Sequence, residues 1–309
     1  MFKLTTFVPA GLIGLTAAVA CAQGMPIEGP APTTALVYAE SKNHTQLDPQ
    51  ALQVQVNGHN VQVTSVEPVS ADRAQVAILI DGGLRSSFNL QINDIKEFVN
   101  GLAPGTEILI GYMENGRVVA PTGFTTDREQ ILGSLHMSIA LPGLSASPYF
   151  CLSDFVKKWP SSAPSARFVL MITNGVDPYN GAPTLMNQDS PYVQTAQEDA
   201  ARAGVAVYSI YFPDAGLRGG RGSLSGQSYL SQVGDATGGM VFNNGSIPPV
   251  SIGPYLTQFG RAIKESYRVT FLAGTGNRKP STLDRLKIKT SQQGMKVHGP
   301  EVVHPGMTE

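Results

Sequence analysis

An acidic residue stands directly after the first long apolar run of the chain. Residues 76–80 are all apolar, and Asp81-Gly82-Gly83-Leu84-Arg85 follows them. A carboxylate is a hard oxygen ligand, so Asp81 could contribute to a site for a cation such as Mg²⁺. Arg85 offers an alternative, a charge-assisted pair with Asp81 that is worth ~1 kcal/mol when it is exposed. A third interpretation is structural: Asp81 ends a strand and caps the helix that follows it.

Residue patterns typical of common catalytic sites are absent from the sequence. There is no Gly-x-Ser-x-Gly, no His-Glu-x-x-His and no Gly-x-Gly-x-x-Gly, and the five histidines are scattered along the chain. Residues 274–281 are similar in composition to a phosphate loop, but Pro280 separates its lysine from its serine, so we interpret them as a surface turn. We therefore expect neither an enzyme nor a small-molecule substrate, with a nucleotide-binding α/β enzyme as the alternative.

Composition bounds the class of protein. The chain has 309 residues, of which 42% are hydrophobic, so it can bury a sizeable core. Charged residues make up only 15%, alongside 33 Gly and 22 Pro, which indicates many loops. The formal net charge of -1 gives no electrostatic reason to expect nucleic acid or an anionic membrane as a partner.

The N-terminus is typical of an exported protein. Lys3 precedes an apolar run over residues 7–19, and Ala20-Cys21-Ala22 is a small-x-small cleavage pattern. The run is shorter than the ~20 apolar residues that a spanning helix needs, so we expect no transmembrane span. Residues 1–22 are thus predicted to be a signal peptide and residues 23–34 a linker, which indicates a secreted or periplasmic protein.

The two cysteines bear on anchoring and redox chemistry. Ala18-Val19-Ala20-Cys21 is similar to a bacterial lipobox, although the usual leucine is missing, so a lipoprotein anchored through Cys21 is the alternative. Once residues 1–22 are removed, Cys151 is the single cysteine left and can form no internal disulfide. It lies in an apolar stretch, so we predict a buried thiol rather than a reactive one.

Two segments show the period-two alternation of half-exposed antiparallel strands. The first is a small β unit over residues 35–70, in which Asn57-Gly58 is a hairpin turn signal. The second is the C-terminal region, residues 267–309, with alternation at 267–271, 286–289 and 295–297. These C-terminal strands could pair with the N-terminal β unit or extend another sheet.

Between these segments, residues 74–266 alternate apolar strands with helices. Continuous apolar runs at 76–80, 108–112, 168–172 and 205–211 are typical of strands buried on both faces. Helical periodicity between them predicts an α/β domain with a doubly wound, mostly parallel sheet. Such a sheet presents its ligand site at the carboxyl ends of its strands. Residues 212–225 are predicted to be a loop, with a helix only from Tyr229.

The strand endings of this region resemble those of von Willebrand factor A (VWFA) domains. The segments that carry the resemblance are residues 77–81, 123–128, 169–175 and 204–210. More narrowly, they are similar to the exported VWFA-related proteins found mainly in acidobacteria, in which a β segment precedes the A domain and a β tail follows it. The resemblance covers about residues 35–303 and implies a Rossmann-like fold.

The resemblance also implies where a metal-ion-dependent adhesion site would lie. VWFA domains hold Mg²⁺ with Asp-x-Ser-x-Ser in one loop, a threonine in a second and an aspartate in a third. Here Asp81 matches the first position, Gly83 and Arg85 replace the two serines, and Asn174 replaces the third-loop aspartate. The threonine should lie near residues 143–147, where Ser145 is the nearest match. Most hard oxygen ligands are thus lost, so we expect no bound metal and no cofactor.

These features together predict a non-catalytic binding or adhesion module. We expect a protein partner at the cell envelope, contacted through the degenerate adhesion site formed by Asp81, Gly83, Arg85, Ser145 and Asn174. A Mg²⁺-dependent adhesion domain with a non-standard site is the alternative.

Overall fold

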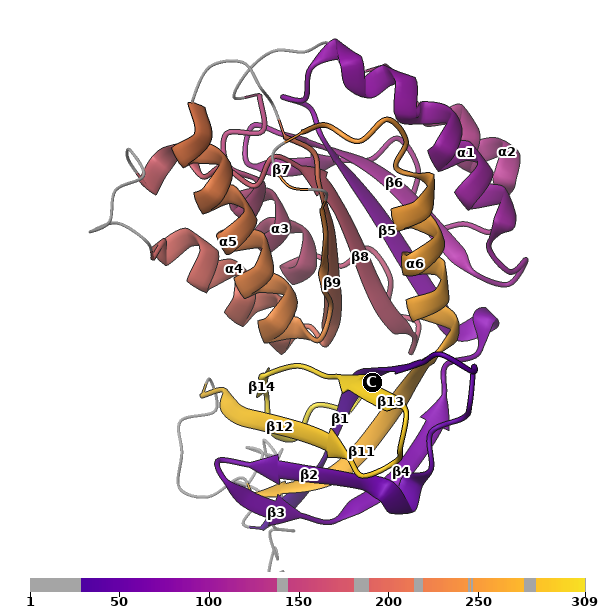
Figure 1. Ribbon diagram of the computed structural model, residues 1–309, viewed down its shortest axis with the longest axis vertical. Helices are drawn as coiled ribbons and strands as arrows, with labels where there is room; N and C mark the ends of the chain where they lie inside the picture. The colour runs from indigo at the N-terminus through magenta and orange to yellow at the C-terminus, as the bar shows by residue number, and fades with distance from the viewer. Residues whose placement is uncertain are drawn as a thin grey trace, which may run out of the picture.

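The computed structural model describes residues 29–137, 144–180, 189–213, 219–243, 245, 247–274 and 282–308 (Figure 1). The predicted signal peptide, the lipobox cysteine Cys21 and most of the predicted surface turn at 274–281 lie outside these residues. Among the described helices, none is long and apolar enough to cross a membrane.

A mostly parallel sheet forms the centre of the molecule. Within the described residues it has six strands, in the order β10-β9-β8-β5-β6-β7, and only β7 runs antiparallel to its neighbour. Every residue of the middle strand β5 is buried, as the continuous apolar run predicted. The strands are β5 (Ala74–Asp81), β6 (Glu107–Glu114), β7 (Arg117–Val119), β8 (Ala166–Thr173), β9 (Val205–Tyr211) and β10 (Val241–Phe242).

Helices cover both faces of this sheet, which confirms the doubly wound α/β prediction. Alternate residues of β5 point to opposite sides, so Ile78 belongs to one core cluster and Leu79 to the other. The first face carries α1 (Ile92–Gly101), α2 (Arg128–Gly133) and α6 (Gly253–Lys264). The second carries α3 (Pro148–Lys157), α4 (Pro191–Arg202) and α5 (Gly219–Thr237). Short 3-10 helices are η1 (Pro49–Ala51), η2 (Ala71–Arg73), η3 (Ser86–Gln91) and η4 (Pro178–Asn180).

The N- and C-terminal β segments form one unit below the central sheet (Figure 1). In the described residues it consists of two four-stranded sheets, β13-β1-β11-β4 and β14-β12-β2-β3, around a shared apolar core. The C-terminal strands therefore pair with the N-terminal ones and do not extend the central sheet. The strands are β1 (Pro30–Ser41), β2 (Leu52–Val56), β3 (His59–Val61), β4 (Val63–Pro68), β11 (Ser266–Gly274), β12 (Asp284–Thr290), β13 (Met295–His298) and β14 (Val302–Val303).

Strand β1 begins at Pro30, inside the segment predicted as a linker over residues 23–34. Its prolines suggested a linker, but Pro30 and Pro32 are exposed while Ala31 and Thr33 between them are buried. Strand β13 pairs only with the later part of β1, from Tyr38 to Ser41. Pro30 and Pro32 therefore lie outside the part of β1 that pairs with β13, and their missing N–H groups remove no hydrogen bond between these two strands.

Helix α5 begins at Gly219, so the loop predicted over residues 212–225 was wrong from that residue onward. The glycines of this segment lower its helix propensity, so the local sequence favours a loop. At Gly226 the glycine instead allows a close approach, because a Cβ there would lie 2.2 Å from the Asn174 carbonyl oxygen. Tertiary packing thus outweighs the local preference.

We predict that Gly239→Ala destabilises the protein by about 3 kcal/mol or more, because the new methyl meets backbone that cannot move aside. A Cβ at Gly239 would lie 1.9 Å from the carbonyl oxygen of Val207 in β9. Urea unfolding measures the change. Gly133→Ala is the matched control, since nothing lies within 4 Å of its added Cβ, and its unfolding midpoint should be unchanged or slightly higher. Equal midpoints for the two variants would contradict the prediction.

Candidate functional site

The loop that follows β5 lies at the carboxyl edge of the central sheet, where a doubly wound fold places its ligand site. The backbone turns sharply after the strand, and the Leu84 N–H donates to the Asp81 carbonyl oxygen at 3.1 Å. The Leu84 side chain is fully buried in the core below the turn. The loop is therefore anchored to the core by an apolar residue.

The Asp81 carboxylate is only 2% exposed, and the protein itself satisfies both of its oxygens. Oδ1 accepts a hydrogen bond from the Gly83 N–H at 2.8 Å, and Oδ2 accepts one from the Thr173 hydroxyl at 2.6 Å. Thr173 is the last residue of β8, the neighbouring strand. Asp81 thus closes its own turn and ties two strand ends together, whereas the cap position of the following η3 is held by Arg85.

Arg85 differs from Asp81 in being exposed. Its backbone is extended, with φ -64° and ψ 159°, and its side chain makes no capping hydrogen bond to η3. The loop therefore presents the positive charge of Arg85 at its surface and keeps the negative charge of Asp81 buried. The pairing of Arg85 with Asp81 stays a prediction.

Asn174 and its neighbours form a second tight turn beside the first. The Asn174 Oδ1 accepts a hydrogen bond from the Val176 N–H at 2.9 Å, and the Gly175 N–H donates to the Thr173 hydroxyl oxygen at 3.1 Å. Helix α5 packs closely on this turn, since a Cβ at Gly175 would lie 2.6 Å from the Gly226 carbonyl oxygen. The side-chain oxygen of Asn174 thus serves the local backbone.

The loop that leads into α3 lies against the Asp81 loop, because a Cβ at Gly82 would be 3.0 Å from Leu144 Cδ2. Ser145, the predicted counterpart of the second-loop threonine, contributes its backbone: its carbonyl oxygen accepts from the Gly116 N–H at 3.1 Å and from the Cys151 thiol at 3.3 Å. Ser147 is the residue that the sequence analysis missed. Its hydroxyl is buried and has no hydrogen-bond partner in the described part of the chain.

Ser147 could have been found from its position, because it is a serine directly before a proline at the start of a helix. It stands at the N-cap of α3 but makes no side-chain capping bond. An unpartnered buried hydroxyl is the one feature here that points to a ligand oxygen or cation.

Further buried polar groups line the same region. The Tyr149 hydroxyl donates to the Gly175 carbonyl oxygen at 2.7 Å, and its pKa is raised by burial and by the charges of Asp177 and Asp81. Asp177 accepts hydrogen bonds from the Ser190 hydroxyl at 2.7 Å and from the Tyr179 N–H at 3.1 Å. Burial, together with the negative charge of Asp81, raises the pKa of the Cys151 thiol to about 12. The predicted burial of this thiol is confirmed, and its lack of reactivity stays a prediction.

The side chains at the predicted site do not fit a Mg²⁺ ion. Asp81 is the one carboxylate among the predicted positions, and the oxygens of Asp81 and Asn174 already accept protein donors. Gly83 offers no side-chain ligand, and Arg85 adds a positive charge. Nowhere in the described residues do three or more His, Cys, Asp or Glu side chains gather in a group that could hold a metal ion.

No protein-family model and no curated protein matches the chain. It aligns with an aerotolerance-related membrane protein of Bacteroides fragilis at 12% identity and a TM-score of 0.44, over 62% of this chain and 98% of that one. A von Willebrand factor type A protein of Catenulispora acidiphila aligns at 10% identity and a TM-score of 0.41, over 90% of this chain and 75% of that one. Proximal thread matrix protein 1 from the mussel byssus aligns at 13% identity and a TM-score of 0.44, over 66% of this chain and 48% of that one. The structure of that protein has a zinc-occupied MIDAS motif.

These TM-scores are below 0.5 and these identities are low, so the fold is judged from the chain's own sheet. This sheet has five parallel strands in the order β10-β9-β8-β5-β6, and helices cover both of its faces. The arrangement confirms the predicted VWFA-like fold of the central domain.

We predict that Thr173→Val lowers the free energy of unfolding by about 1.5–3 kcal/mol, because the buried Asp81 carboxylate loses a charge-assisted hydrogen bond. Valine keeps the shape of threonine, so packing is little changed. Thr173→Ser is the control, since it keeps the hydroxyl and loses one methyl, for a decrease of about 1 kcal/mol. Urea unfolding distinguishes them, and a serine variant as unstable as the valine variant would contradict this role of the hydroxyl.

We predict that the Cys151 thiol does not react with a thiol reagent at pH 8 until the protein unfolds. Its pKa and that of Tyr38 are raised by burial to about 12, so the folded chain holds these protons more tightly than the unfolded chain. Their contribution to stability is intact below about pH 9 and is lost as the pH rises towards 12. Absorbance of released thiol chromophore on a Cys21→Ser variant gives the rate, and rapid labelling at pH 8 in buffer would refute the assignment.

Proposed function

We propose that this chain, whose central domain has a VWFA-like fold, is an exported, non-catalytic module that binds a protein partner at the cell envelope. The contact surface is the carboxyl edge of the central sheet, and binding needs no metal ion. The observation that carries the proposal is the gathering of exposed apolar side chains at this edge, around a loop whose exposed charge is Arg85.

Large hydrophobic side chains are seldom as exposed as those at this edge. Leu90 is 79% exposed in η3, and Val250 is 100% exposed in the segment between β10 and α6. The two segments lie together, because the Gln91 side-chain amide donates to the Val250 carbonyl oxygen at 3.2 Å and its oxygen accepts from the Ile252 N–H at 3.0 Å. Leu90 and Val250 therefore stand on two neighbouring segments of this edge.

Three more exposed hydrophobic residues belong to the same edge. Tyr179 follows β8 and Ile247 follows β10, while Met137 adjoins His136, whose ring stacks on Tyr112 near the end of β6. Among the large hydrophobic side chains exposed in the described residues, Val119 is the remaining one, and it lies opposite Tyr112 in β7, the outermost strand of the central sheet. Exposed apolar side chains accompanied by aromatic, Met and Arg residues are typical of protein interfaces.

Arg85 supplies the polar part of this surface. Its guanidinium presents a planar fork that matches a carboxylate, and in VWFA domains a partner's carboxylate completes the metal shell. Here the arginine would take the place of the cation, so a partner acidic residue would bind to it directly. Apolar contacts around it would exclude water and strengthen that bond.

Metal-dependent adhesion is the second candidate, and the unpartnered hydroxyl of Ser147 favours it. A cation held by Asp81 would bind the carboxylate lone pairs that the Gly83 and Thr173 donors do not use. Isothermal calorimetry with Mg²⁺ tests this directly. We expect no saturable heat, and a saturable response that Ser147→Ala abolishes would establish the metal-dependent alternative.

The partner surface is tested by affinity capture from envelope extract with the full chain. We expect that Arg85→Ala and the double variant Leu90→Ser/Val250→Ser each lose the proteins that the wild type retains, and that EDTA leaves retention unchanged. Val119→Ser is the matched control, because it also removes an exposed hydrophobic side chain but lies in the outermost strand β7, separated from β5 by β6. Equal retention by all variants would exclude the carboxyl edge as the contact.

A further inference from the structure

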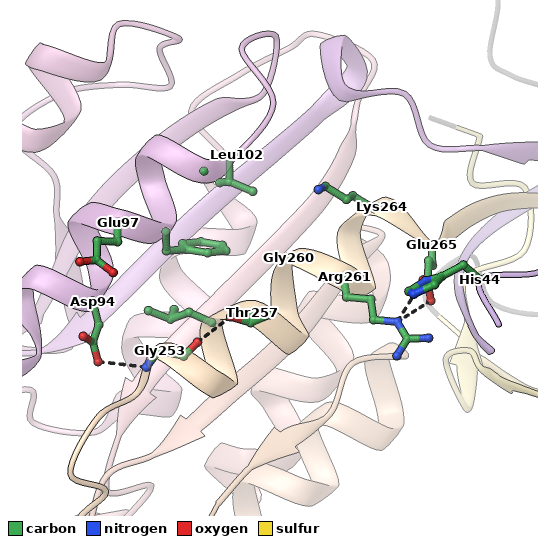
Figure 2. A pocket seen from close by; sticks show the side chains of 13 residues that line it. His44, Asp94, Glu97, Leu102, Gly253, Thr257, Gly260, Arg261, Lys264 and Glu265 are labelled. Carbon is green, nitrogen blue, oxygen red and sulfur yellow. Dashed lines mark hydrogen bonds and ion pairs between the residues drawn. The ribbon is translucent and has the colours of Figure 1, made fainter. Parts of the chain in front are cut away.

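A groove of about 560 Å³ runs between α1 and α6 on the first helical face (Figure 2). Its apolar lining includes Phe98, Leu102 and Leu256, while His44 from the β unit lies at one end. This volume is within the ~300–1,000 Å³ range of ligand sites. The Asp94 end of the groove adjoins the carboxyl edge, but Arg85, Leu90 and Val250 do not line the groove, so the two surfaces can be altered separately.

Polar contacts fix the α6 wall at both ends. At its N-terminus, the Asp94 carboxylate of α1 accepts hydrogen bonds from the Ser251 hydroxyl at 2.6 Å and from the N–H groups of Ile252 at 2.8 Å and Gly253 at 3.0 Å. At its C-terminus, Glu265 accepts from Arg261 Nε at 3.0 Å and is paired with His44 Nδ1 at 2.6 Å. The groove is therefore preformed, and these charges are already compensated.

Two charges beside the groove are not compensated in this way. Glu97 of α1 and Lys264 of α6 are both exposed, and neither makes a side-chain hydrogen bond or ion pair with the residues that the structure describes. Figure 2 shows Glu97 next to Asp94 at one end and Lys264 towards the other, with Gly260 between them. The groove thus has a negative end, an apolar middle and a positive end.

Gly260 keeps the middle of the groove open. It stands inside α6, where glycine is less favourable than alanine by ~1 kcal/mol. A Cβ at this position would lie 3.3 Å from Phe98 Cε2. A larger side chain there would project over the apolar floor and fill the groove.

We propose that this groove binds an extended peptide segment in which two apolar residues separate a basic residue from an acidic one. The basic side chain pairs with Glu97, the apolar side chains pack on Phe98 and Leu256, and the acidic one pairs with Lys264. An anionic lipid surface or a nucleic acid fits less well, because the exposed Glu97 would repel phosphate at one end. This peptide site does not rest on the function proposed for the carboxyl edge.

Fluorescence anisotropy with the full chain and a labelled, end-capped Lys-Leu-Leu-Glu peptide tests the site. The end-capped peptides Lys-Leu-Leu-Lys and Glu-Leu-Leu-Glu are the controls, and we expect both to bind more weakly. Glu97→Lys and Lys264→Glu should each weaken binding ~2–5-fold, as expected for a single exposed ion pair. The double variant Glu97→Lys/Lys264→Glu should restore it, because the groove is then matched by the peptide in the opposite direction.

Gly260→Leu should weaken binding at least ~10-fold by filling the groove, since the apolar contact area is lost. Gly133→Leu is its matched control, an exposed helical glycine with nothing within 4 Å of the added Cβ. The charge variants keep the test valid if Gly260→Leu does not fold. Leu90→Ser/Val250→Ser should leave peptide binding unchanged, which separates this site from the carboxyl edge.

Three results would overturn the proposal. One is equal affinity for all three peptides, and another is a double charge variant that binds no better than the single variants. The third is binding of anionic phospholipid vesicles with no binding of the Lys-Leu-Leu-Glu peptide.

Discussion

A buried carboxylate at the end of β5 determines the geometry of the carboxyl edge of the sheet. A charge placed in the interior is tolerated only when hydrogen bonds compensate the water it has lost. Asp81 obtains them from the Gly83 N–H and the Thr173 hydroxyl, so the turn after β5 and the end of β8 are held against each other. Thr173 in turn accepts from the Gly175 N–H, which extends the same network into the next loop.

The same network uses the polar side chains of the predicted site positions for contacts within the protein. The oxygens of Asp81 accept backbone and hydroxyl donors, and the turn at Asn174 is closed by its own side chain. The charge that faces outward is Arg85. A scaffold of this kind can keep a preformed surface at the strand ends without an ion to organise it, because hydrogen bonds and buried Leu84 provide the order.

Helix α6 joins this edge to the β unit. Its N-terminus is held by Asp94 and Gln91, next to the exposed Leu90 and Val250, and its C-terminus leads directly into β11. There the Arg261 side chain donates to the Ser41 carbonyl oxygen, and the Ala39 N–H donates to the Glu265 carbonyl oxygen at 3.0 Å. The central domain and the β unit are thus connected by hydrogen bonds as well as by the chain.

The sequence by itself determined the class of fold, because the hydrophobic period of each strand depends on which of its faces is buried. The run at 76–80 is apolar throughout and forms a central strand, whereas the alternation at 286–289 places Leu286 inward and Lys287 outward. It also located Asp81 at a strand end. Only the tertiary structure decided that the C-terminal strands pair with β1 and β2, that α5 includes its glycines, and that Ser147 rather than Ser145 carries the unpartnered hydroxyl. Pairing partners, close helix contacts and hydrogen-bond satisfaction depend on residues far apart in the chain, and local patterns do not encode them.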